Sequence, residues 1–157
     1  MTDFKQLLIN EDCFYEQTTI HGIDCSIGYI KEFRWSWLAN QLNLFIIIGQ
    51  TEQKIDKTLI EEFSKKSFEY ALKNNKGWPR GFQSMVSSIA ILQGNEIEND
   101  AMLFCMQASK KHWAAIEIPV LYDSNQKVAI KYNSAPMWGA VFFPFLTKKI
   151  EEITSRF

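Results

Sequence analysis

The sequence predicts an α+β (mixed α/β) fold, in which one twisted, mostly antiparallel sheet of about five to six strands is packed by two to three helices. Two observations support this prediction. Short apolar runs between turn-forming residues alternate with longer segments whose apolar residues recur at the helical period. The stretch 85–122 also combines strand, helix and strand patterns in succession, which puts a strand-helix-strand unit at the centre. Without a visible linker or repeat, residues 1–157 are expected to form a single globular domain.

The first half of the central unit is a strand followed by a helix. An apolar run over residues 85–92 ends in turn-forming residues, a pattern typical of a buried strand. Asn99 then offers an N-cap for a helix over residues 101–108. Because this helix is apolar on nearly every side, we expect it to be covered on both sides. Residues 110–112, two lysines and a histidine, suit the C-terminus of that helix.

The second half of the unit is a strand over residues 114–122. A crossover of this length can join parallel neighbours. Pro119 has no backbone N–H to donate, so this strand should lie at a sheet edge or be bulged there. Glu117 is expected to point outward from a half-covered strand.

The N-terminal part is predicted to contain a short helix and a hairpin. Residues 4–9 suit a short helix, and residues 14–20 and 23–30 suit two strands joined at Gly22, which tolerates the positive φ of a tight turn. Beyond the hairpin, aromatic and polar residues alternate, which predicts a continuing strand with one aromatic face. That face consists of Phe33, Trp35 and Trp37.

A buried strand and a long helix follow. Residues 44–49 have the continuous apolar character of a strand covered on both faces. Residues 54–74 are predicted to form an amphipathic helix with a charged side. Phe68 and Leu72 are four residues apart and project from that charged side on a helical wheel, so we expect them to contact something beyond the domain's own core.

The C-terminal part is predicted to contain one more hairpin and one more helix. Residues 127–132 return as a strand after a turn. Pro144 suits the first position of a helix. Its apolar residues then fall on one narrow stripe, formed by Leu146, Ile150, Ile153 and Phe157.

Composition narrows the class of protein. The formal net charge is −1, from 17 basic and 18 acidic residues, so no overall field favours nucleic acid or an anionic membrane. No apolar run reaches the ~20 residues of a membrane span. The three cysteines lack close pairing, and the N-terminus lacks the pattern of a signal peptide, which together predict a cytoplasmic protein. Aromatic residues make up 14% of the chain, with 12 Phe, 5 Trp and 5 Tyr.

The reactive side chains are not spaced for a known chemistry. Of Cys13, His21 and Cys25, only the last two approach the spacing of a structural zinc site. Cys105 and His112 would lie about 10 Å apart on a continuous helix, out of reach for a nucleophile and its base. The glycines around Arg80 lack the ending of a phosphate-binding loop. We therefore predict no catalytic residue, no metal and no cofactor, and we expect no nucleic-acid partner.

Two functional hypotheses follow. The first is a non-enzymatic protein-interaction module, a homodimer or a partner-binding protein, because exposed apolar groups mark association sites. Its predicted interface consists of Phe68, Leu72, Trp35 and Trp37. The alternative is a small-molecule-binding protein or an enzyme, because aromatic walls with a few charged groups are typical of ligand pockets. Its predicted pocket consists of Trp78, Arg80, Tyr122, Lys131, Tyr132 and Trp138.

Overall fold

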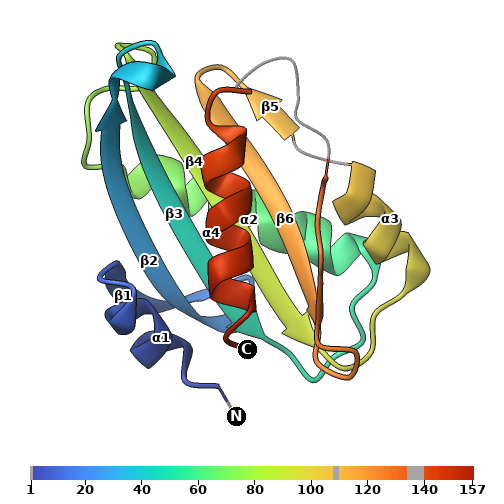
Figure 1. The fold of residues 1–157 in the computed structure, drawn as a ribbon. Helices are drawn as coiled ribbons and strands as arrows, with labels where there is room; N and C mark the ends of the chain where they lie inside the picture. The colour runs from blue at the N-terminus through green and yellow to red at the C-terminus, as the bar shows by residue number, and fades with distance from the viewer. Residues whose placement is uncertain (1, 108–109, 134–139) are drawn as a thin grey trace.

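The computed structural model describes residues 2–107, 110–133 and 140–157. The strands run in chain order as β1 (Phe14–Ile20), β2 (Ile23–Arg34), β3 (Asn40–Gln50), β4 (Ser84–Gly94), β5 (Lys110–His112), β6 (Ala115–Asp123) and β7 (Val128–Ile130) (Figure 1). The α-helices are α1 (Phe4–Asn10), α2 (Lys57–Asn74), α3 (Asn99–Gln107) and α4 (Phe143–Thr154), and a single 3₁₀ turn, η1 (Trp35–Trp37), joins β2 to β3. None of the described helices is long and apolar enough to cross a membrane.

All the described strands belong to one mixed sheet, so the predicted α+β class is confirmed. The order across the sheet is β1-β2-β3-β4-β6-β5, and β7 pairs with the far part of β6. Pairing is parallel in the middle, between β3, β4 and β6, and antiparallel in the other four pairs. The predicted strand-helix-strand unit is β4-α3-β6, and a second one, β3-α2-β4, precedes it.

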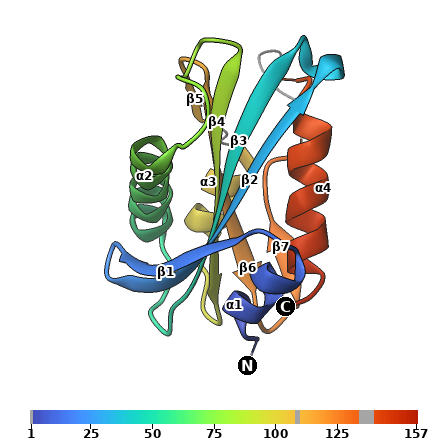
Figure 2. The same cartoon turned by 90° about the vertical axis from the view of Figure 1, so that its left-hand side faces the viewer.

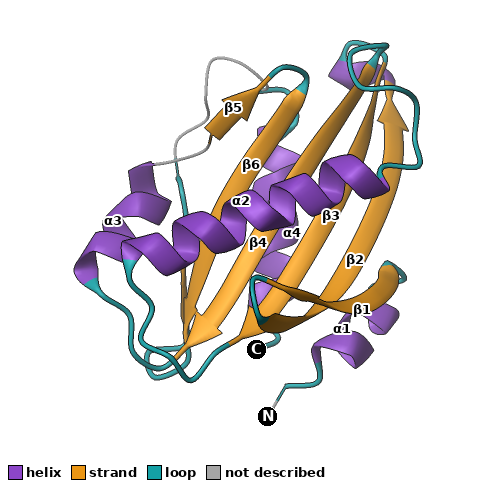
Figure 3. Ribbon diagram, turned by 180° about the vertical axis from the view of Figure 1, so that it is seen from behind, coloured by secondary structure: helices purple, strands orange, loops and turns teal. Residues whose placement is uncertain are grey.

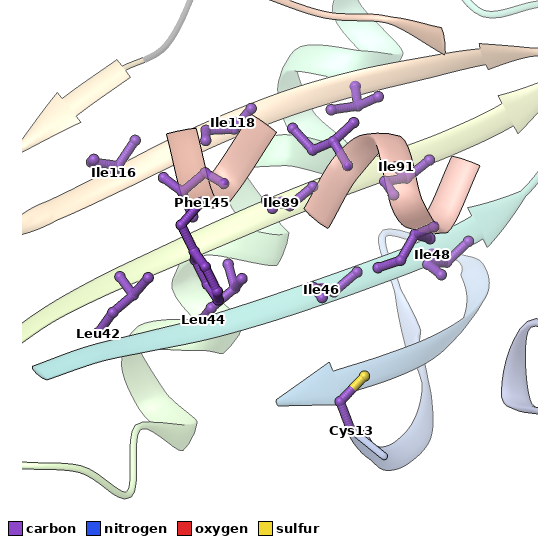
Figure 4. Close-up of a cluster of buried hydrophobic side chains, with 14 of the residues drawn as sticks. Cys13, Leu42, Leu44, Ile46, Ile48, Ile89, Ile91, Ile116, Ile118 and Phe145 are labelled. Carbon is purple, nitrogen blue, oxygen red and sulfur yellow. The ribbon is translucent and has the colours of Figure 1, made fainter. Parts of the chain in front are cut away.

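Helices cover both faces of the sheet (Figures 2 and 3). The helices α2 and α3 lie on one face, and α4 lies on the other, with α1 near the sheet's lower end. The strand β3 shows why both faces need cover. Leu44, Ile46 and Ile48 belong to the buried cluster on the α4 side (Figure 4). Phe45 and Ile47 belong to the buried cluster on the α2 side. All five side chains are fully buried. The prediction of a strand covered on both faces is therefore confirmed.

The predicted stripe on the last helix is confirmed for its first three residues, whereas Phe157 lies beyond the end of α4. Leu146, Ile150 and Ile153 of α4 are buried against the sheet, and Pro144 lies in its first turn. The half-buried ring of Phe157 packs 4.9 Å from the ring of Phe4, centroid to centroid. The first helix and the residue Phe157, which follows the last helix, therefore meet at the same end of the sheet (Figure 1).

Pro119 lies where β6 has an open side. β6 pairs with β4 along its whole length. On its other side, β5 pairs with residues 115–117 and β7 pairs with residues 121–123. Among the described strands nothing pairs with residues 118–120 on that side, so the chain accommodates proline at an edge, as its missing N–H predicts.

Three local predictions are wrong. The helix α3 is covered on one side only, because Ala101 and Cys105 are buried whereas Leu103 and Met106 are 51% and 44% exposed. Residues 110–112 do not extend that helix but form the strand β5. The strand β2 ends at Arg34, and the next three residues turn as η1, which sends Trp35 and Trp37 in different directions instead of along one face.

Candidate functional site

Large apolar side chains gather at the end of the sheet opposite to Phe4 and Phe157. We call this group the aromatic end: Phe33, Trp35, Leu38, Trp78, Phe82 and Trp113. Phe33 comes from the end of β2, and the others come from the β2-β3 turn, the connection between α2 and β4, and the β5-β6 turn. Trp35 is 82%, Leu38 77%, Phe82 74% and Trp113 68% exposed. Four such exposed side chains at one end of the sheet are more than scattered exposed residues explain.

Neighbouring rings hold this surface in shape. The ring of Phe33 meets those of Trp35 and Trp78 edge to face, at centroid distances of 5.3 and 6.1 Å. The guanidinium of Arg80 lies 5.5 Å from the ring centroid of Trp113, within the range of a cation-π contact. The rings of Phe33, Trp35 and Trp78 therefore restrain one another, and Arg80 restrains the ring of Trp113.

The backbone beneath the aromatic end adopts unusual conformations. Leu38 and Ala39 have φ angles of 56° and 55°, and Gln83 and Ala114 have 50° and 47°. Positive φ is costly for residues with a side chain, by roughly 1 kcal/mol or more each. All four residues lie in the connections that carry the exposed rings, so the turns at this end are strained. Such backbone strain is common at functional sites.

A cavity of about 400 Å³ opens at the aromatic end. Its walls are mostly apolar and include Trp37, Leu38, Met85, Trp113 and Phe142. Gly81 is needed here, since a Cβ at this position would lie 2.1 Å from Cη2 of Trp113, and its φ is 91°. The absence of a side chain at residue 81 thus lets the indole of Trp113 form one wall.

A polar network fixes the connection that carries Trp78. The hydroxyl of Tyr29 donates to Asn43 Oδ1 at 2.7 Å, and Asn43 Nδ2 donates to Ser84 Oγ at 3.0 Å. Ser84 Oγ in turn donates to the carbonyl of Trp78, whose own N–H donates to Gln41 Oε1 at 2.9 Å. Since Asn43 is fully buried, this chain of bonds firmly anchors the loop to β3 and β4.

A second polar cluster lies under α2, around the carboxylate of Glu117 on β6. Glu117 is 2% exposed, which contradicts the expectation that it points outward. Ser64 Oγ of α2 donates to Glu117 Oε1 at 2.8 Å, and His112 Nε2 of β5 lies 3.0 Å from Glu117 Oε2. The imidazole also stacks on the ring of Phe68, with centroids 4.1 Å apart. A buried carboxylate requires such partners.

Lys110 adds a further link between β5 and α2. Its Nζ lies 2.9 Å from Glu61 Oε1, and this hydrogen bond lowers the pKa of Glu61. With His112 and Phe68, it fastens the short strand β5 to the helix above it.

The cluster around Glu117 does not have the order of a hydrolytic triad. In a triad the base stands between the nucleophile and the acid, whereas here the carboxylate stands between Ser64 and His112. Ser64 is also fully buried. Within the described ranges, no group of three His, Cys, Asp or Glu side chains could hold a metal ion. We therefore interpret this cluster as structural.

The cysteines are not activated either. Burial raises the pKa of Cys13 from 9.0 to about 11, and it raises the pKa of Cys25 and Cys105 to about 12. All three are free and buried, so they remain thiols at neutral pH.

The predicted interface residues lie in different places in the structure, and most of them are buried or half-buried. Trp35 lies at the aromatic end, but Trp37 is buried beneath it against Phe142. The expectation that Phe68 projects from the domain is wrong, because the ring is 6% exposed and lies under His112. Leu72 is half-buried and packs on the core under α2.

The predicted pocket residues are not brought together. Trp78 and Arg80 lie at the aromatic end, whereas the ring of Tyr122 packs near the opposite end on Phe157, 4.8 Å away. Lys131 pairs with Glu151, and the ring of Tyr132 meets that of Phe143. Trp138 lies outside the described residues.

Sequence reasoning missed Leu38, Phe82 and Trp113. Each follows or precedes a strand in a short turn, where apolar residues follow no period. The sequence did contain one signal that could have identified them. They are large apolar residues that lie among turn-forming residues, outside every helix and strand pattern.

No protein-family model, no curated protein and no solved structure matches the chain.

Proposed function

We propose that this protein is a non-enzymatic protein-interaction module that docks a partner through the aromatic end. The observation that carries the proposal is the exposure of Trp35, Leu38, Phe82 and Trp113 in turns at one end of the sheet. Trp and Phe are enriched at binding hot spots, where rigid rings bury much area at little entropic cost. The free, buried thiols are consistent with work in the reducing cytoplasm.

The surface also indicates what the partner presents. The cavity of about 400 Å³ beside Trp113 has room for one large apolar side chain of the partner. Arg80 contacts the ring of Trp113, which lines that cavity, so an acidic group beside the anchoring side chain would gain a favourable contact. The partner is therefore a protein with an exposed apolar anchor and an acidic neighbour.

The test is a triple variant that removes the apolar surface while keeping the fold. Leu38→Asn tolerates the positive φ, and Phe82→Ser and Trp113→Ser remove two exposed rings. The matched control replaces three exposed apolar residues elsewhere, as Ile9→Ser, Leu103→Ser and Met106→Ser. Chemical cross-linking in the source cells, followed by mass spectrometry, identifies partners of the unmodified protein, and calorimetry with the purified partner measures affinity.

We expect the triple variant to weaken binding by roughly a hundredfold, as the loss of two hot-spot rings predicts, while the control binds normally. Equal binding by the triple variant and the unmodified protein would refute the proposal.

A second candidate function rests on the cavity itself. Its volume of about 400 Å³ falls in the range of small-molecule sites, and its walls are apolar and aromatic. A thermal-shift screen with apolar and aromatic acids tests this candidate. A ligand that stabilises the unmodified protein but not Gly81→Ala, where the new methyl displaces Trp113, would support this candidate.

A further inference from the structure

A groove between β2 and α4 is separate from the aromatic end and lies on the other side of Trp37. The groove has a volume of about 620 Å³, and it is lined by the second half of β2 and the first two turns of α4, which lie side by side in Figure 2. Such a volume falls in the range of small-molecule sites. Leu38, Phe82 and Trp113, which the docking test changes, do not line this groove.

Arg34 is held at the wall of this groove by three neighbours. Its Cζ lies 4.7 Å from the ring centroid of Trp37 and 5.0 Å from that of Phe145, within the range of cation-π contacts. Its Nε donates to Glu32 Oε1 at 2.5 Å. Its two terminal nitrogens have no hydrogen-bond partner among the residues that the structure describes, and the side chain is 46% exposed. A guanidinium fixed in this way is preorganised to bind an oxyanion with two parallel hydrogen bonds.

Lysines add positive charge to the same part of the groove. The Nζ of Lys149 lies 5.9 Å from the centroid of the Phe145 ring, which also contacts the guanidinium. The Nζ atoms of Lys148 and Lys149 lie 3.6 and 2.8 Å from the carboxylate of Glu152, so two lysines share one acid. Lys31 of β2 lines the groove as well. Four basic side chains therefore surround the space between β2 and α4.

Acidic side chains offset only part of this charge. Glu32 and Glu152 pair with three of the four basic side chains and contribute two negative charges. Two further acids, Glu11 and Asp12, line the end of the groove beside α1, where Arg156 pairs with the first of them at 2.8 Å. Counted over the described part of the chain, the space between β2 and α4 therefore has a surplus of two positive charges.

We propose that this groove binds a phosphate group, either free phosphate or the end group of a phosphate monoester. A phosphate group carries a charge of about −1.5 to −2 at neutral pH and has three strong acceptor oxygens. Two oxygens can accept from the fork of Arg34 while the third accepts from Lys149. A single carboxylate has one charge and two oxygens, so it matches the surplus of two charges less well. This inference goes beyond the proposed docking function and does not depend on it.

Titration of the unmodified protein locates the site. In heteronuclear NMR spectra, inorganic phosphate should shift the amide signals of residues 30–34 and 145–149. Succinate at the same ionic strength should bind roughly tenfold more weakly, because each of its carboxylates offers one charge and two oxygens. Methyl phosphate distinguishes the two sources: tighter binding than inorganic phosphate identifies a monoester as the ligand, and equal or weaker binding identifies the free ion. Shifts confined to other residues, or succinate binding as tightly as phosphate, would overturn the proposal.

A conservative variant tests the role of the guanidinium. Arg34→Lys keeps the charge but removes the fork, so the dissociation constant for inorganic phosphate should rise by roughly tenfold or more. Lys66→Gln is the matched control, because it removes an exposed cation from α2 on the other face of the sheet and should leave the constant unchanged. Circular dichroism verifies that both variants fold, and if Arg34→Lys does not fold, the positions of the shifted amides in the unmodified protein decide. Unchanged affinity in folded Arg34→Lys, or an equal loss in both variants, would overturn the proposal.

Discussion

His112 Nε2 lies 3.0 Å from Glu117 Oε2, and this contact joins a three-residue strand to a buried carboxylate. The strand β5 has only three pairs with β6, too few to hold it at the sheet by backbone bonds alone. The imidazole also stacks on Phe68 of α2. The side chain of His112 therefore links β5, β6 and α2. It holds in place the turn that contains Trp113.

Replacing His112 by alanine should cost roughly 1.5–3 kcal/mol of unfolding free energy, because Glu117 loses a partner and stays buried. Urea unfolding followed by circular dichroism measures the loss. His21→Asn is the matched control, since His21 is exposed and asparagine tolerates its φ of 52°. A change in His112→Ala as small as in the control would contradict the role given to this contact.

Two buried serines of α2 should respond in opposite ways. Ser64→Ala removes the donor to Glu117 Oε1 and should cost about 1–3 kcal/mol. Ser67 is equally buried, but its hydroxyl has no hydrogen-bond partner among the described residues. Ser67→Ala should therefore be neutral or stabilising, because alanine is the better helix former. Urea unfolding of the two variants decides, and equal losses would show that the bond to Glu117 contributes nothing.

Gly81→Ala should alter the aromatic end more than it alters stability. The new methyl would lie 2.1 Å from Cη2 of Trp113, so the indole must move. Gly22→Ala provides the control, since Gly22 has a similar φ of 74° but no atom within 4 Å of its ideal Cβ. Both variants should lose about 1 kcal/mol from backbone strain. Only Gly81→Ala should change the near-ultraviolet circular dichroism of the tryptophans, and an unchanged spectrum would place Trp113 elsewhere.

Alkaline pH should destabilise the protein through its thiols. Burial raises the pKa of Cys25 and Cys105 from 9.0 to about 12, so the unfolded chain loses these protons first as the pH rises. Their contribution is complete below about pH 9 and declines up to about pH 12, by at most about 1.4 kcal/mol per pH unit for each thiol. Urea unfolding across this range should show a shallower decline for Cys25→Ala than for the unmodified protein. An identical decline would mean that this thiol ionises equally in both states.

Periodic patterns identified the elements of the sheet and its long helices. β3 and β4 are continuous apolar runs, and α2 and α4 carry apolar residues at the helical period, so each could be recognised locally. The burial of Glu117 could not, because its partner Ser64 is 53 residues away in the sequence. In a strand that is covered on both faces, apolar and polar residues do not alternate, so the sequence does not indicate on which side an acidic residue lies or whether it is buried.

The error at Phe68 has a related cause. A helical wheel puts Phe68 on the charged side of α2, and that side would be open if the sheet ended at β6. β5 extends the sheet by one strand, and His112 covers the ring. The three-residue strand is too short to leave a period-2 pattern in the sequence, so its effect on the helix could be seen only in three dimensions.

The contact between Phe4 and Phe157 fixes where the chain enters and leaves the fold, at the end of the sheet away from Trp113. A fluorophore, an affinity tag or a bait protein fused ahead of Phe4 or behind Phe157 would therefore sit at the far pole of the molecule. Immobilised through either fusion on a sensor chip, the protein would offer its exposed rings to the solution instead of to the support.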